Sequence, residues 1–213
     1  MPKPQHKSGE PLRHPEQRVG VFIDVQNMYY SARNLYNAKV HFGNIVAGAA
    51  EGRKLIRAIA YTVRTPAGEE RPFFEALYNL GLEVKEIDLQ VFFGGAKKAD
   101  WDVGIAVDTI RISPALDVVV LVSGDGDFLP LIEYLQHSGK LVEVMAFKDT
   151  AASKCIEAAD AFIDLGAETD RFLITGRQPL LRTVKLEEPE EEKIVEEEEE
   201  EEKPRRRTKR TIM

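Results

Sequence analysis

Four aspartates are spaced so that they could do chemistry together. The segment DVVVLVSGDGDF ends with two carboxylates, Asp125 and Asp127, each preceded by a glycine. The segment RVGVFID also ends in an aspartate, Asp24, and a fourth one, Asp102, follows the basic loop GGAKK. Carboxylates a few ångströms apart repel one another, so a cation must lie among them if all are to stay ionised. Hard oxygen ligands select Mg²⁺ or Mn²⁺, and such a metal can activate water and stabilise charge on a phosphoryl group.

Each of these residues also has a plain structural explanation. Asp127 could cap a helix, as could Asp100, and Asp102 could complement a helix dipole. Asn27 could likewise serve only as a cap. Aspartate disfavours strands, however, and capping alone does not require two strands to end alike. Taken together, the acids therefore favour a metal site over a set of unrelated caps.

The elements that must position these acids are strands followed by helices. The run Val118–Val122 is apolar throughout, which is typical of a strand buried on both faces in a parallel sheet. Strand and helix then alternate along the chain, which predicts a single α/β domain with a doubly wound, mainly parallel sheet and helices on both faces. Strands are expected at residues 18–24, 54–63, 82–92, 117–123, 141–147 and 161–165, and helices at 25–36, 72–80, 100–112, 128–137 and 151–159. Residues 42–51 are expected to form a short helix or a loop. The alternation in 82–92 suits the edge of the sheet.

In open α/β sheets, ligands bind at the carboxyl edge of the strands. If the strand of Asp24 neighbours that of Asp125, the strand-end acids share one crevice, and the helix that begins near Asp102 delivers the fourth. Glycines there let the backbone turn tightly and approach what the carboxylates hold. Asp108 lies about 240° around the same helix from Asp102, so it is not expected to join them.

The composition indicates one domain with tails. The chain has 213 residues, of which 43% are hydrophobic, and its single cysteine, Cys155, excludes an intramolecular disulfide. That cysteine content fits a reducing compartment, and neither a secretory signal nor an apolar run of about 18 residues is visible, so we expect a cytoplasmic protein without a membrane partner. We predict a disordered leader at 1–17, the domain at 18–165, and a disordered charged tail at 166–213.

The formal net charge of −7 is concentrated in that tail. From Glu187 onward the net charge is −5, which leaves −2 for residues 1–186. The tail joins a glutamate-rich tract, Glu187–Glu202, to a basic block, Arg205–Arg210. Bulk charge thus neither requires nor excludes a nucleic-acid partner. A homodimer or another protein partner could engage the tail.

Other motifs are missing. No Gly-Lys-Ser/Thr follows Ser123–Asp127, so this loop is not a P-loop, and it lacks the further oxygen ligands of an EF-hand. The residues after Asp24 lack the second aspartate that phosphatases of the haloacid dehalogenase type use. The four histidines are scattered, with no pair at ligand spacing.

Three segments together, FIDVQNMYYSA, KKADWDVGIAVD and VVLVSGDGDFLPLIEYLQHSGKLVEV, resemble the NYN-domain family, in particular its LabA-like branch. That family belongs to the PIN-like nuclease superfamily. The resemblance covers about residues 18–165. It implies a Rossmann-like sheet and a ribonuclease that hydrolyses RNA phosphodiester bonds with metal-activated water. Its Mg²⁺ or Mn²⁺ ligands would be Asp24, Asp102, Asp125 and Asp127.

Four further residues could bind the RNA substrate. Asn27 and Ser123 could orient water or phosphate, and Lys97 and Lys98 could contact the RNA backbone or form only a solvated loop. Two rival functions remain open. The fold could be a non-catalytic module that binds RNA or protein, or the same metal site could serve a small-molecule phosphohydrolase. A long basic groove would favour RNA, and a closed apolar pocket would favour the phosphohydrolase.

Overall fold

The computed structural model describes residues 13–65, 68–91, 97–98 and 100–174, with residues 90–91 and 97–98 described by their backbone only. The strands are β1 (Arg18–Asp24), β2 (Lys39–Val40), β3 (Lys54–Arg64), β4 (Glu83–Asp88), β5 (Gln90–Val91), β6 (Lys97–Lys98), β7 (Val118–Val122), β8 (Leu141–Ala146), β9 (Ala161–Asp164) and β10 (Leu173–Ile174). The α-helices are α1 (Val25–Tyr36), α2 (Phe42–Ala50), α3 (Arg71–Asn79), α4 (Asp102–Ile112), α5 (Leu129–His137), α6 (Ser153–Ala158) and α7 (Thr169–Phe172). Short 3-10 helices occupy Ser113–Ala115, Gly126–Phe128 and Lys148–Thr150.

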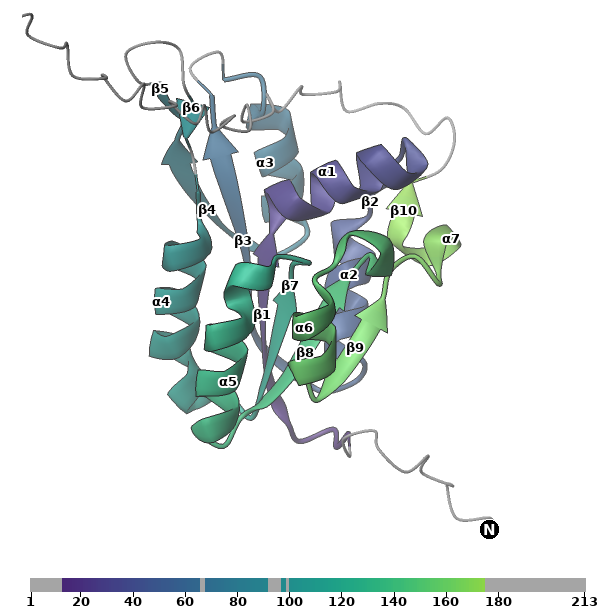
Figure 1. The fold of residues 1–213 in the computed structure, drawn as a ribbon. Coiled ribbons are helices and arrows are strands. Elements are labelled where there is room, and N and C mark those ends of the chain that lie inside the picture. Colours follow the sequence, from purple (N-terminus) through teal and green to yellow (C-terminus); the bar gives the residue numbers. More distant parts are fainter. Residues whose placement is uncertain (1–12, 66–67, 92–96, 99, 175–213) are drawn as a thin grey trace, which may run out of the picture.

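Six strands form one parallel sheet in the order β4-β3-β1-β7-β8-β9 (Figure 1). The chain builds one half of the sheet outward from β1, then returns to the centre and builds the other half outward from β7. The strand order therefore reverses between β1 and β7, which is the topological switch point of a doubly wound sheet. This arrangement confirms the predicted fold class, and β4 lies at an edge as expected.

The centre of the sheet is apolar because helices cover both of its faces. All five residues of β7 are buried, as are residues 19–23 of β1. Helices α1, α2 and α3 pack on one face, and α4, α5 and α6 pack on the other (Figure 1). Met28 of α1 and Ile45 of α2 reach the first core, and Ile105 of α4 and Ile132 of α5 reach the second.

The ordered structure extends beyond the predicted domain at both ends. Residues 169–174, predicted to belong to the disordered tail, form α7 and β10, and β10 pairs with β2. Phe172 is fully buried in the first core, which ties this segment to the domain. At the other end, Arg13 of the predicted leader forms ion pairs with Glu51 and Glu143. The remaining leader, 1–12, and tail, 175–213, lie outside the described residues.

No helix in the described part of the chain is long and apolar enough to cross a membrane.

Candidate active site

The switch point brings together the ends of β1 and β7. Asp24 closes β1 and caps α1, since its Oδ1 accepts a hydrogen bond from the Asn27 backbone N–H at 3.0 Å. Its Oδ2 accepts from the Ser123 hydroxyl at 3.3 Å. The Asn27 side-chain oxygen in turn accepts from the Gly124 backbone N–H at 2.9 Å. Asn27 is therefore more than a cap of its own helix, because it holds the loop after β7 against α1.

The loop after β7 is folded by its own side chains. The Ser123 hydroxyl oxygen accepts from the Asp125 N–H at 3.2 Å, and Asp125 Oδ1 accepts from the Asp127 N–H at 2.9 Å. A Cβ on Gly124 would lie 3.1 Å from the Ala151 backbone, so the close approach of the next loop favours glycine at that position. Asp125 follows the end of β7, as predicted, and it also caps the short 3-10 helix Gly126–Phe128.

The start of α4 brings a second pair of acids. The Trp101 ring packs on Tyr61 with centroids 5.1 Å apart, and its Nε1 donates to the Thr62 carbonyl at 2.7 Å. These contacts fix the beginning of α4 against β3, which neighbours β1. Asp100 Oδ1 accepts from the Asp102 N–H at 2.8 Å, so the two carboxylates lie on one tight turn.

The acids from the three segments lie within one another's electric field. Burial is the largest cause that raises the pKa of Asp24 to about 6, and the charges of Asp125 and Asp100 raise it further, against hydrogen bonds that lower it. Burial also leads the causes that raise the pKa of Asp102 to about 7, followed by the charges of Asp100, Asp125 and Asp24. We call Asp24, Asp100, Asp102 and Asp125 the acid cluster.

Asp100 is the member that the sequence analysis considered only as a cap. A signal for it exists in the sequence, because Asp100 and Asp102 are spaced two residues apart, as are Asp125 and Asp127. Asp127 is less closely associated with the acid cluster than the other aspartates are. It is exposed, and it is not among the charges that most raise the pKa of Asp24 or Asp102. Its charge acts, with that of Asp125, on the Cys155 thiol, whose pKa is raised mainly by burial.

For the two lysines that were predicted to contact RNA, the structure describes only the backbone. Lys97 and Lys98 form β6, which pairs with β5 in a small antiparallel hairpin. In Figure 1 this hairpin lies at the same end of the molecule as the carboxyl edge of the sheet. Their predicted contact with RNA stays a prediction.

Asp108 lies on α4, as Asp102 does, but it has a basic partner. It forms an ion pair with Lys85 and accepts a hydrogen bond from the Tyr61 hydroxyl at 3.1 Å. As expected from its position on α4, Asp108 does not join the acid cluster. Within residues 13–65, 68–91 and 100–174, no such ion pair from lysine or arginine reaches a member of that cluster.

The acid cluster suits a hard divalent cation by its chemistry. No group of three or more His, Cys, Asp or Glu side chains among the described residues is already arranged to hold an ion. Mg²⁺, however, keeps several waters and is commonly bound through one or two carboxylates. The charges of Asp100 and Asp125 help to raise the pKa of Asp24 and of Asp102. Within residues 13–65, 68–91 and 100–174 no lysine or arginine pairs with these acids, which makes Asp24, Asp102 and Asp125 the candidate ligands.

Comparison with known proteins agrees with this architecture. The model of the NYN domain family matches residues 18–166. The low amplitude and bright protein LabA of Synechococcus elongatus is 29% identical over 157 residues, which cover 70% of this chain and 83% of that protein. An uncharacterized protein of Methanocaldococcus jannaschii is 28% identical over 163 residues, covering 73% of this chain but 58% of that protein.

A solved structure shows the same fold. The crystal structure of a protein of unknown function from Vibrio parahaemolyticus superposes with a TM-score of 0.69 at 32% identity, covering 77% of this chain and all of that one. The parallel six-stranded sheet is that of a Rossmann-like, PIN-like domain. The family model covers most of the chain and spans every member of the acid cluster, so the chain belongs to the NYN domain family.

Proposed function

We propose that the protein is a Mg²⁺- or Mn²⁺-dependent endoribonuclease. The observation that carries this proposal is the convergence of Asp24, Asp102 and Asp125 near the switch point of the sheet, without an ion pair to lysine or arginine within residues 13–65, 68–91 and 100–174. Buried charges are normally paired with an opposite charge or hold a metal, so a partly buried group of acids without such a pair supports a site that receives a cation. Membership of a family of PIN-like nucleases supports RNA as the substrate.

Some residues of the site would bind the cation, and others would orient its ligands. A divalent cation, when bound, lowers the pKa of water and stabilises charge on a phosphoryl group. Asp24, Asp102 and Asp125 would hold it, and Asp100 would keep the turn before α4 in place through its bond to the Asp102 N–H. Ser123 is within reach of both Asp24 and the Asp125 backbone, so its hydroxyl can orient the Asp24 carboxylate or a water beside it.

Cleavage assays with a matched pair of variants test the proposal. Purified protein is incubated with mixed RNAs in Mg²⁺, in Mn²⁺ and in EDTA. Asp125→Asn removes a charge from the acid cluster, whereas Asp170→Asn removes an exposed charge from α7. We expect cleavage only with a divalent ion, a loss of at least about a hundredfold in Asp125→Asn, and no change in Asp170→Asn. Wild-type rates in Asp125→Asn would contradict the proposal.

A second candidate, a module that binds RNA without cutting it, is favoured by one observation. No three acids are prearranged around an ion in the part of the chain that the structure describes. This candidate predicts RNA binding that is the same in EDTA and in Mg²⁺, with intact RNA recovered from every reaction. Metal-dependent fragments that disappear in Asp125→Asn would exclude it.

A further inference from the structure

The start of α4 is attached to the sheet by Trp101. The indole ring lies edge-on to the Tyr61 ring, at an interplanar angle of 64°, and its Nε1 donates to the Thr62 carbonyl. Trp101 also begins the helix, because its carbonyl accepts a hydrogen bond from the Ile105 N–H at 2.7 Å. The other large apolar side chain of this turn, Val103, is 76% exposed and adds little packing. The position of the first turn therefore depends on the indole ring.

A glycine makes room for that ring. A Cβ on Gly104 would lie 2.5 Å from Trp101 Cε3 and 2.8 Å from Cζ3, which is closer than van der Waals contact allows. The helix thus accepts the ring in this place only while residue 104 has no side chain. Glycine is a poor helix former compared with alanine, so Gly104 is unfavourable for the helix alone and favourable for docking of the ring.

The support on which Trp101 packs lies directly beside Asp24. In the pairing of β1 with β3, Asp24 is the register partner of Tyr61. Trp101 in turn immediately precedes Asp102 in the chain. A short path of neighbours therefore leads from Asp24 across the sheet to Tyr61, through the ring contact to Trp101, and on to Asp102. The docking of one ring fixes where these two carboxylates lie relative to each other.

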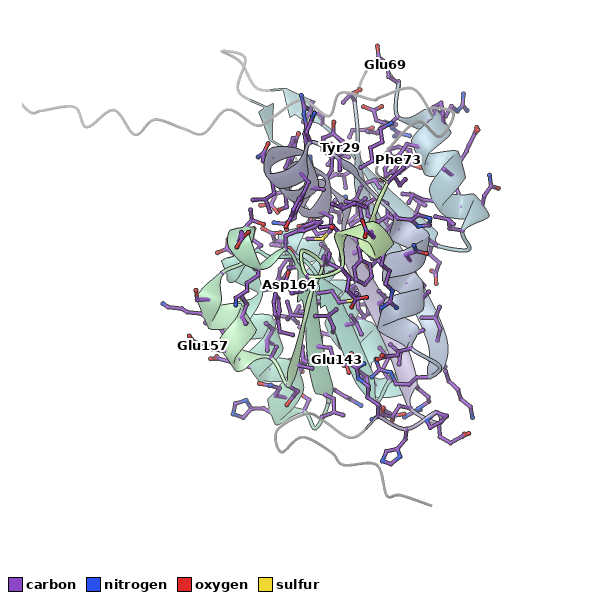
Figure 2. All side chains as sticks on the ribbon, turned by 90° about the vertical axis from the view of Figure 1, so that its right-hand side faces the viewer. Tyr29, Glu69, Phe73, Glu143, Glu157 and Asp164 are labelled. Carbon is purple, nitrogen blue, oxygen red and sulfur yellow. The ribbon has the colours of Figure 1, made fainter. Side chains whose placement is uncertain are left out.

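Tyr61 is itself held firmly enough to act as this support. Its side chain is buried, and its hydroxyl donates to Asp108, which forms an ion pair with Lys85 of β4. In Figure 2, Glu69, in the segment that follows β3, lies at the end of the molecule opposite Glu143. The support thus lies toward the carboxyl edge of the sheet, on the strand beside that of Asp24.

We propose that Trp101 is a positioning residue that sets the affinity of the acid cluster for a divalent cation, by holding Asp102 in place relative to Asp24. This inference rests on the metal site of the proposed function. Carboxylates from separate segments bind a cation tightly only if they are held at the right separation beforehand. Substitution of residues that orient metal ligands typically weakens metal binding about 10- to 100-fold.

Calorimetric titration of the metal-free protein with Mn²⁺ tests the proposal. Trp101→Leu removes both the ring and its N–H donor, and it should weaken Mn²⁺ binding about ten- to a hundredfold. Trp101→Phe keeps an aromatic ring and should restore part of that loss. Gly104→Ala retains Trp101 but displaces its ring. It should also weaken Mn²⁺ binding, although alanine favours the helix.

Val103→Ala is the matched control, because it shortens an exposed apolar side chain in the same turn. Its Mn²⁺ affinity should stay within about twofold of the wild type. Melting curves verify the fold of each variant, and Gly104→Ala decides the outcome if Trp101→Leu does not fold. Wild-type affinity in either of these two folded variants, or an equal loss in Val103→Ala, would overturn the proposal.

The wild type carries a second readout of its own. Trp101 is the one tryptophan of the chain, so its fluorescence reports on the start of α4. Mn²⁺ quenches the fluorescence of nearby indole rings. We expect quenching over the concentration range in which calorimetry detects binding, and none in Asp125→Asn. Quenching that persists in Asp125→Asn would place the ion away from the acid cluster and overturn the proposal.

The outcome is separable from that of the cleavage assay, because Mn²⁺ binding is measured without RNA. Binding that Trp101→Leu weakens, with no cleavage in any reaction, would keep the positioning role and reject only the enzyme. Metal-dependent cleavage with equal Mn²⁺ affinity in the wild type, Trp101→Leu and Gly104→Ala would reject only the positioning role.

Discussion

The two edges of the β-sheet differ in the charges that surround their acidic side chains. Near its amino edge, Glu143 of β8 is 1% exposed and receives two hydrogen bonds from Arg53, at 2.7 and 2.9 Å. Arg53 is held in place by the Ala49 carbonyl at 2.7 Å. At the carboxyl edge, Asp24 and Asp102 are surrounded by other aspartates. The first arrangement pairs a buried charge with an opposite one, whereas the second holds like charges close together, as is common at functional sites.

The largest expected effect comes from breaking the amino-edge pair. Arg53→Met leaves Glu143 buried without its main partner, and removing one member of a buried pair costs about 3–5 kcal/mol. Arg13 Nε, 3.6 Å from Glu143, compensates only in part. Urea unfolding at neutral pH measures the loss. Arg64→Met, which breaks an exposed pair with Asp88, should cost at most about 1 kcal/mol. Equal losses in the two variants would remove the distinction between the edges.

Removing a charge at the carboxyl edge should have the opposite sign. The pKa of Asp24 is raised from 3.8 to about 6 by burial, so between those values the folded state binds more protons than the unfolded state. The stability of the metal-free protein therefore falls as the pH rises through this interval. Asp24→Asn keeps an oxygen to cap α1 and should be more stable than the wild type by about 1–3 kcal/mol at pH 7.

The same comparison near pH 4 serves as the control. There Asp24 is protonated in the folded wild type, so Asp24→Asn and the wild type should unfold at nearly the same urea concentration. Asp170→Asn should show no pH-dependent difference. A destabilised Asp24→Asn at pH 7 would mean that this carboxylate is compensated as Glu143 is.

A divalent cation should compensate the charge of the acid cluster, with which no lysine or arginine within residues 13–65, 68–91 and 100–174 forms an ion pair. Mg²⁺ or Mn²⁺ at ten times its dissociation constant would stabilise the folded state by about 1.4 kcal/mol, or roughly 3–6 °C in melting temperature. The shift should vanish in Asp125→Asn and persist in Arg53→Met, whose change lies at the other edge. A wild-type melting curve that millimolar Mg²⁺ and Mn²⁺ leave unmoved would indicate that the acids serve only as caps.

The smallest expected effect concerns the charged tail, which lies outside the described residues. Its basic block, Arg205–Arg210, can attract phosphates, while the glutamates before it can compete with RNA for basic residues of the domain. Truncation after Leu186 should leave the melting temperature and the Mg²⁺ shift unchanged but alter RNA affinity by a few fold at low salt. Identical binding at low and high salt, with and without the tail, would indicate only a solubilising role.

Much of this architecture could be predicted from local sequence signals. The buried run that became β7 identified the parallel sheet, and Asp24 ends β1 at the carboxyl edge of that sheet, as the sequence predicted. Asp102 was also expected at the start of its helix, where the structure has it. These predictions succeeded because each element is long enough to show its hydrophobic pattern, and because an aspartate at the end of a predicted strand can be recognised without knowing its neighbours in space.

The remainder depends on contacts between distant segments. Helix α7 and strand β10 have four and two residues, too few for any periodicity, and Phe172 orders them by packing into the core. The spacing of Asp100 and Asp102 is visible in the sequence, but the packing of Trp101 on β3, which fixes the start of α4, is not. The pairing of Arg53 with Glu143 joins residues separated by 90 positions, so composition and spacing gave no sign of it.

The central strand pair has a consequence for how the chain acquires activity. The hydrogen bond between Ser123 and Asp24 closes a sequence separation of 99 residues, and β1 pairs with β7 across a similar distance. Such non-local contacts form late and slowly in folding, because the loop between them must be closed first. Partly folded or partly synthesised chains therefore cannot assemble the acid cluster. A nuclease built in this way would remain harmless on the ribosome until the second half of its domain had emerged.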